Sequence, residues 1–223
     1  VAICDRVDAI RDTMGLFRWS LGGGRWLQAN FGGGAMARFN LSTQRNNLEV
    51  VDFTAAAPVD VRPAPGHTIR AGWRHTSSHL GDDFIEREKA VVVKRAFDSL
   101  GGLYAYAPRP TVRLYGGGSY AINKVHQEGR AGLQTGAEWM GEGLAGRRVR
   151  PFVAQDLKWW ERVAWRPAWT MRVGVRFWDA KAAAAARAFV EYFTGRMTYL
   201  QFEHRHESRW TFGLNLEVGN PVR

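Results

Sequence analysis

The stretch Ala168–Trp178, AWTMRVGVRFW, decides the fold class because its side chains alternate in character without a break. Its apolar row consists of Trp169, Met171, Val173, Val175 and Phe177. The other row carries Arg172 and Arg176 among small residues. A period of two is that of a β-strand with one apolar and one polar face. The stretch therefore predicts a strand whose two arginines face away from its apolar row.

The same alternation returns in Ile69–Trp73, Leu133–Trp139 and Trp210–Val218, with glycine, asparagine and proline turn signals between the segments. Alternating segments of ~9–11 residues are long enough for a tilted membrane strand. Aromatic side chains near the row ends and Gly, Thr and paired Arg on the polar faces are typical of a barrel with a wet interior. We therefore predict an all-β, antiparallel, up-and-down transmembrane β-barrel of roughly 10–12 strands. A soluble barrel with its apolar face inward is the alternative.

The 223 residues show no composition break, so we predict a single domain over residues 1–223. Residues 1–14 lack clean alternation, which suggests an irregular or helical N-terminal segment. Pro58, Pro63 and Pro65 suggest a long loop, because proline cannot donate to a strand ladder. Arg187–Thr194 follows an alanine run, and we interpret it as a strand rather than a helical turn.

The formal net charge of +10 comes mostly from 26 arginines against 5 lysines. Many of these arginines lie at even spacings within apolar segments, as do Arg172 and Arg176 four positions apart, and they do not form a basic tail. We see no nucleic-acid-binding motif and predict no nucleic-acid partner. With a single cysteine, Cys4, the chain cannot form an intramolecular disulfide.

The stretch His67–Arg87, HTIRAGWRHTSSHLGDDFIER, carries the candidate chemistry. His75 and Ser77 continue the apolar row of this strand, and a His and a Ser on one face can act as base and nucleophile. A third polar group must orient the imidazole, and we assign Asp82 to this role, with Asp83 or a neighbouring strand as alternatives. The competing interpretation is a structural hydrogen-bond network at a strand end.

Two further groups of residues suggest ligands. Asp82 and Asp83 offer oxygens that suit calcium, although we predict no resident metal or other cofactor. His75 and His79 lie ~13 Å apart on an extended strand, too far to share one ion. Arg147, Arg148 and Arg150 could bind lipid phosphates, because arginine pairs well with phosphate. A solvated basic loop is the alternative for these arginines.

The residues His75–Asp83, HTSSHLGDD, resemble the signature H-x-S-S-H-L-G-D-E of an uncharacterised family of bacterial envelope proteins, catalogued as a domain of unknown function. The similarity extends through Arg113–Gly118 and more loosely through Phe152–Leu157, and Asp83 stands where Glu is usual. This resemblance implies a location in the outer membrane of Gram-negative bacteria and supplies no activity. A shorter similarity, His75-x-Ser77, is shared with the H-x-S-N motif of outer-membrane phospholipase A and lipid A deacylase, from which Ser78 departs.

These observations predict a monomer-scale outer-membrane barrel with an envelope-structural or partner-binding role. The alternative is an acyl hydrolase that acts on phospholipid or lipid A through His75 and Ser77. The expected partners are membrane lipids, lipopolysaccharide and other envelope proteins.

Overall fold

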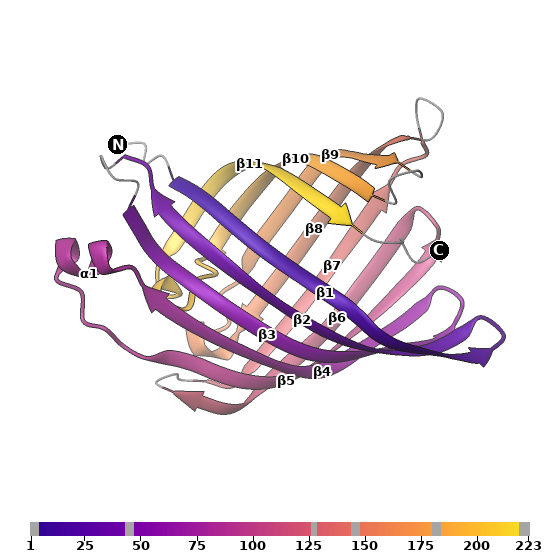
Figure 1. Ribbon diagram of the computed structural model, residues 1–223, viewed down its shortest axis with the longest axis horizontal. Helices are drawn as coiled ribbons and strands as arrows, with labels where there is room; N and C mark the ends of the chain where they lie inside the picture. The colour runs from indigo at the N-terminus through magenta and orange to yellow at the C-terminus, as the bar shows by residue number, and fades with distance from the viewer. Residues whose placement is uncertain (1–4, 43–46, 126–128, 144–147, 180–183, 219–223) are drawn as a thin grey trace.

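Most of the chain is β-strand in the computed structural model, which describes residues 5–42, 47–125, 129–143, 148–179 and 184–218 (Figure 1). The strands are β1 (Asp5–Gly22), β2 (Arg25–Asn40), β3 (Asn47–Ala64), β4 (His67–Leu80), β5 (Arg95–Arg109), β6 (Val112–Val125), β7 (Ala131–Met140), β8 (Val149–Trp160), β9 (Ala168–Asp179), β10 (Ala184–Arg196) and β11 (His206–Val218). The short helical elements are α1 (Asp82–Glu88), η1 (Glu161–Val163) and η2 (Leu200–Phe202).

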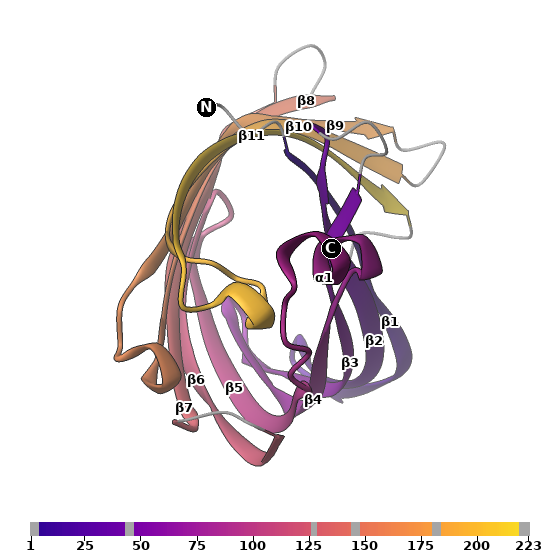
Figure 2. The same cartoon turned by 90° about the vertical axis from the view of Figure 1, so that its left-hand side faces the viewer.

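Each strand pairs antiparallel with the next one along the chain, so the order in the single sheet is β1 to β11. Figures 1 and 2 show this sheet curled into a barrel. The predicted all-β, up-and-down architecture of 10–12 strands is confirmed, with eleven strands in the described residues. In the described residues, no helix has the length and apolar character needed to cross a membrane.

Alternation sorts the side chains of every strand onto an outer and an inner face. On β9, Val173 and Phe177 point outward and are 47% and 45% exposed. Arg172 points inward, where its Nε donates to Glu191 Oε2 of β10 at 2.5 Å. The predicted opposition of the apolar row and the arginines on this strand is therefore confirmed. On this strand the inward arginine Arg172 thus has a carboxylate of the neighbouring strand as its partner.

The β10–β11 connection folds back into one end of the barrel and caps it (Figure 2). This cap comprises residues 197–205, and its base is closed by a hydrogen bond from the Met197 amide to the Arg205 carbonyl at 3.0 Å. Tyr199, Leu200 and Phe202 are 1%, 3% and 4% exposed. Phe202 packs against Phe84 of α1 with ring centroids 5.2 Å apart. The cap thus supplies the apolar core that the strands, with their polar inner faces, lack.

Polar contacts anchor the cap to strands across the barrel. The Leu200 amide donates to Asp52 Oδ2 at 3.1 Å, and Gln201 Nε2 donates to the Val93 carbonyl at 2.9 Å. Glu203 accepts from Arg95 Nη1 at 2.7 Å and from Arg162 Nε. One short connection therefore holds together β3, β5 and the β8–β9 connection.

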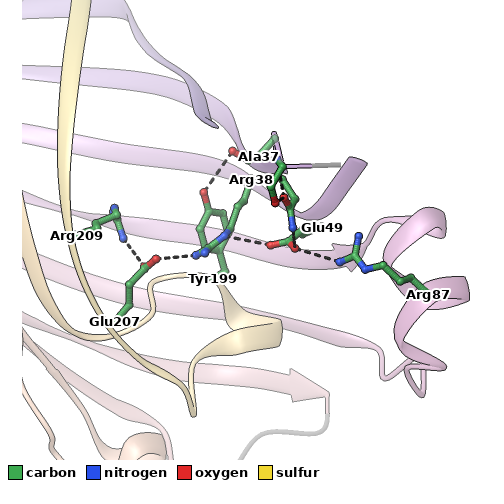
Figure 3. A network of polar contacts seen from close by, with 9 residues as sticks. Ala37, Arg38, Glu49, Arg87, Tyr199, Glu207 and Arg209 are labelled. Atoms are coloured by element: carbon green, nitrogen blue, oxygen red, sulfur yellow. Dashed lines mark hydrogen bonds and ion pairs between the residues drawn. The ribbon is translucent and has the colours of Figure 1, made fainter. Parts of the chain in front are cut away.

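A second network of polar contacts joins the two ends of the sheet (Figure 3). The first and last strands of the sheet, β1 and β11, run in the same direction because the sheet has an odd number of antiparallel strands. Arg38 of β2 bonds Glu207 of β11 at 2.8 Å and Glu49 of β3 at 3.2 Å. The Tyr199 hydroxyl donates to a β2 carbonyl, and burial raises the pKa of this phenol, which keeps it a donor. The first and last parts of the chain are thus fastened at the capped end.

Two expectations about irregular segments are wrong. The segment from residue 5 to residue 14 is strand and pairs with β2, because ladder hydrogen bonds to a neighbouring strand outweigh weak local alternation. Pro58 and Pro63 lie within β3, where a long loop was predicted. The β2–β3 register has a gap opposite Ala57 and Pro58, and the Asn30 side chain fills it by donating to the Pro58 carbonyl at 3.2 Å.

Candidate functional site

Strand β4 divides the motif HTSSHLGDD between the two faces of the barrel. His75 and Ser77 continue the outward row that begins with Ile69 and Trp73, which are 40% and 36% exposed. Opposite Trp73 on β5 lies Leu100, which is 51% exposed. The His/Ser pair therefore borders the apolar outer belt of the barrel, as the alternation predicts.

The neighbouring strand supplies the group that orients the imidazole. His75 and Asp98 face each other across β4 and β5, and His75 Nδ1 lies 2.9 Å from Asp98 Oδ1. A carboxylate only accepts, so Nδ1 carries the proton, and in the neutral imidazole Nε2 is then an acceptor. The imidazole also stacks on Trp73, with ring centroids 6.3 Å apart and planes at 26°. Two contacts therefore hold the ring with its second nitrogen available.

Asp98 is itself positioned by β6. Its second oxygen, Oδ2, accepts a hydrogen bond from Asn123 Nδ2 at 3.3 Å. A bulge between Asp98 and Ser99 brings Asn123 opposite Asp98. Three adjacent strands thus contribute one polar chain, Asn123–Asp98–His75, to the outer face.

Ser77 lies beside this chain on the same face, half-buried and paired in register with Phe53 and Ala96. Positions two apart on a strand are ~6.6 Å apart, so a rotated imidazole can reach the serine hydroxyl. Within the part of the chain that the structure describes, the Ser77 hydroxyl makes no hydrogen bond. Catalytic hydrogen bonds often form only when substrate binds.

The inward residues of the motif have a structural role. Ser78 is 3% exposed, and its hydroxyl donates to Asp52, the carboxylate that anchors the cap. Gly81 approaches β3 so closely that a Cβ there would lie 2.0 Å from the Leu48 carbonyl oxygen. Thr76 is also buried. Packing inside the barrel accounts for these residues, whereas His75 and Ser77 face outward.

Asp82 and Asp83 lie apart from this arrangement, in the first turn of α1. The carboxylate that bonds His75 is Asp98, so the role assigned to Asp82 falls to the neighbouring strand. His79 faces outward and packs edge-on against Phe53, with centroids 5.9 Å apart. Among the described residues, no group of three or more His, Cys, Asp or Glu side chains is arranged to hold a metal ion.

Of the three predicted phosphate-binding arginines, Arg147 lies outside the described residues. Arg148 precedes β8, and its carbonyl accepts from the Trp178 amide at 2.8 Å. Arg150 lies within β8 opposite Arg176 of β9, on the inner face, and donates to the Gly141 carbonyl at 3.1 Å. The structure thus places Arg148 and Arg150 on the rim and inner wall of the uncapped end of the barrel.

Sequence reasoning missed Asp98, although a signal was present. Its row along β5 continues with Leu100, Gly102 and Tyr104, and a carboxylate in such a row interrupts an otherwise lipid-compatible surface. Nothing local indicates its partner, because the β4–β5 register depends on a connection of 14 residues, 81–94, between the two strands.

Comparison with known proteins finds one family. A family profile described as "Protein of unknown function (DUF1207)" matches residues 12–217. Neither the curated proteins nor the solved structures contain a match.

Proposed function

Because this chain belongs to the DUF1207 family, whose description assigns no activity, we propose its function from the geometry of the site. We propose that the protein is a bacterial outer-membrane β-barrel that hydrolyses acyl esters of membrane lipids through Ser77, His75 and Asp98. The observation that carries this proposal is the 2.9 Å hydrogen bond from His75 to Asp98 on the outward face, beside Ser77.

The outer surface supports placement in a membrane. Large apolar side chains project outward from most strands, including Phe31, Leu133 and Phe212, which are 50%, 53% and 84% exposed. The inner face instead carries ion pairs such as Arg70 with Asp60, whose atoms are 2.6 Å apart. An apolar outside with a polar inside is the arrangement of membrane barrels and the reverse of a soluble barrel.

The three side chains fit the roles of a serine hydrolase. The Ser77 hydroxyl oxygen attacks the acyl carbonyl carbon while His75 Nε2 takes the hydroxyl proton. The ester C–O bond then breaks, and the same proton passes from His75 to the leaving alcohol. Water attacks the acyl-serine with His75 again acting as base, which releases the fatty acid and restores Ser77. Asp98 holds the imidazole in the required tautomer throughout.

The outward position of Ser77 favours a lipid substrate. The serine and histidine adjoin the apolar belt of Trp73 and Leu100, so an ester near the acyl chains of a surrounding lipid would lie against them. A water-soluble ester would have to reach the same hydroxyl through the lipid phase. Phospholipid and lipid A both present such esters.

The envelope-structural or partner-binding role is the second candidate, and the filled interior favours it. Glu203 is 4% exposed and bonds two arginines within the capped end, so the barrel does not form an open pore there. In this case His75, Ser77 and Asp98 would form a structural polar group at the rim of the apolar belt.

The test is an acyl-ester assay with phospholipid and lipid A on protein purified in detergent, with and without calcium. We expect release of fatty acid by the unmodified protein and its loss in Ser77→Ala and in His75→Ala. The double variant should lose no more than either single variant, because the pair acts as one unit. A serine-reactive phosphonate should label the unmodified protein at Ser77.

Ser208→Ala provides the matched control. Ser208 is an exposed serine on β11 whose hydroxyl lies 2.7 Å from that of Thr194, and its loss should leave turnover unchanged. If no substrate is turned over by unmodified protein with a β-type circular dichroism spectrum, the hydrolase proposal is wrong and the structural role stands.

A further inference from the structure

Lys94 stands immediately before β5, on the outer side of the wall near the capped end. Ser78 pairs with Arg95 in the β4–β5 register. One further step along both strands places Lys94 beside His79. Arg95 points inward and bonds Glu203 at 2.7 Å, so its neighbour Lys94 lies on the outward side. Lys94 is exposed and, among the residues that the structure describes, has no ion-pair partner.

This lysine lies one layer closer to the capped end than the proposed nucleophile. The β5 residue that pairs with Ser77 follows Lys94 by two positions, which is ~6.6 Å on a strand. The cap fixes this spacing, because Gln201 Nε2 donates to the Ser78 carbonyl at 3.2 Å and to the Val93 carbonyl at 2.9 Å. Lys94 is therefore held at a set height beyond Ser77 and on the same face.

The segment before Lys94 exposes apolar side chains that folding does not bury. Val91 and Val92 are 82% and 62% exposed. The other exposed large apolar side chains of the described residues lie on strands, except Trp165 in the β8–β9 connection. Adjacent exposed apolar side chains mark a contact surface. Two valines followed by a lysine suit the boundary of a bilayer, where apolar groups meet acyl chains and an ammonium group meets the headgroups.

The charges along this outward row are ordered by depth. Asp98 follows Lys94 by four positions, ~13 Å on a strand. Its two carboxylate oxygens are bonded by His75 and Asn123, so it does not neutralise the lysine. A lipid that carries one anionic group is therefore attracted near the capped end and repelled at the level of Asp98, which orients it along the row.

On the basis of the proposed hydrolysis at Ser77, we propose that Lys94 and His79 bind the phosphate of the substrate lipid. An ammonium group forms a charge-assisted hydrogen bond with phosphate, and an imidazole N–H adds a second donor. The His79 ring packs edge-on against Phe53, which holds it on the outer face beside Lys94.

The spacing of the two sites defines a substrate class. In a glycerophospholipid, the phosphate and the second acyl ester are carried by adjacent carbon atoms of the glycerol. Lipid A likewise carries a phosphate and an acyl ester on adjacent carbons of a glucosamine ring. A phosphate held at Lys94 places such an ester one layer deeper, against the Ser77 hydroxyl. The substrate is therefore a lipid with a phosphate and an acyl ester on neighbouring carbons.

The first measurement compares phosphatidic acid with diacylglycerol, which lacks the phosphate, as substrates in detergent micelles. Lys94→Gln should raise KM for phosphatidic acid about tenfold or more, the loss expected for one charge-assisted hydrogen bond, with kcat unchanged. KM for diacylglycerol should not change. Lys94→Arg should restore most of the affinity for phosphatidic acid.

Lipid A with and without its phosphates distinguishes the two sources of the phosphate. A KM that depends on Lys94 for phosphatidic acid assigns the phosphate of a phospholipid to this site. Dependence that appears with phosphorylated lipid A alone assigns the phosphate of lipid A.

Lys89→Gln is the matched control. Lys89 is another exposed lysine of the same connection, five positions earlier at the C-terminal end of α1. Its loss removes the same charge from the same end of the barrel, so the general attraction to anionic lipids falls equally in the two variants. KM for the phosphorylated lipids should stay near that of the unmodified protein. Equal KM values in the two lysine variants, for phosphatidic acid and lipid A alike, would overturn the proposal and leave the hydrolase in place.

A Ser77→Ala background tests the phosphate site without turnover. Native mass spectrometry reports how much intact short-chain phosphatidic acid or lipid A this variant retains. Addition of Lys94→Gln should reduce retention about tenfold, whereas addition of Lys89→Gln should not. If the unmodified protein hydrolyses no ester but retention depends on Lys94, the phosphate site stands and the hydrolase is wrong. Retention of both lipids that does not depend on Lys94 would refute the site.

Discussion

The cap offers the sharpest test of what holds this barrel together, through the substitution Glu203→Gln. The Glu203 side chain is 5% exposed, and it bonds Arg95 and Arg162, whose side chains are 17% and 15% exposed. The amide of glutamine keeps the size and removes the charge. Two nearly buried cations then face a neutral group.

The magnitude follows from that burial. Removal of one partner from a buried ion pair costs about 3–5 kcal/mol, because the remaining charge stays out of water without compensation. The same substitution in an exposed pair costs about 0–1 kcal/mol. Glu138→Gln is the matched control, since Glu138 bonds Arg113 at 3.0 Å between side chains that are 45% and 43% exposed.

The assay is the free energy of unfolding by denaturant in detergent, followed by circular dichroism. Limited proteolysis within residues 197–205 reports separately on the cap. Glu203→Gln should lower the free energy of unfolding by several kcal/mol more than Glu138→Gln and should expose the cap to protease. Equal, small losses in the two variants would show that the cap does not depend on its ion pairs and would refute this reasoning.

Three further outcomes are expected. Asp98→Asn should lose nearly as much ester hydrolysis as Asp98→Ala in the lipid assay, because the amide can donate an N–H to His75 Nδ1 and so favours the wrong imidazole tautomer; full turnover by Asp98→Asn would remove Asp98 from its positioning role. Val173→Lys should cost ~2–4 kcal/mol of unfolding free energy in lipid if this position lies near the bilayer midplane, and Thr170→Ser should be nearly silent; equal tolerance would contradict the facing. Gly81→Ala, with a Cβ 2.0 Å from a β3 carbonyl oxygen, should lower the thermal midpoint, whereas Gly102→Ala, with its nearest atom at 3.8 Å, should not; matching midpoints would mean that the close approach relaxes at no cost.

The sequence alone predicts the parts of this fold that follow a local period. Rows such as Trp169–Phe177 repeat every two residues, so strand, facing and approximate strand number can be inferred without coordinates. The position of Pro58 inside β3 cannot be inferred from a local period, because it depends on a gap in the ladder that Asn30 fills from another strand. The cap is equally hidden, since Glu203 meets Arg95 across 108 residues of chain.

The candidate site divides in the same way. His75 and Ser77 can be recognised from the sequence as a motif, because residues two positions apart on a strand lie on the same face. Asp98 becomes their partner only through the β4–β5 register, which no local pattern fixes. Arg150 and Arg176 likewise lie opposite each other only through the β8–β9 register.

The motif HTSSHLGDD contacts both the interior and the outer surface of the barrel, because its side chains alternate between the two faces of β4. Its inward residue Ser78 bonds Asp52, which also accepts from the cap amide of Leu200. Its outward neighbour Ser77 faces the apolar belt beside His75. Consecutive residues of a strand share their backbone, so the contact that fixes Ser78 also fixes the height of Ser77 in the wall. In the proposed membrane barrel, a cap that keeps β4 in register would therefore keep Ser77 at one depth in the lipid, which gives the buried half of the motif a reason to accompany the exposed half.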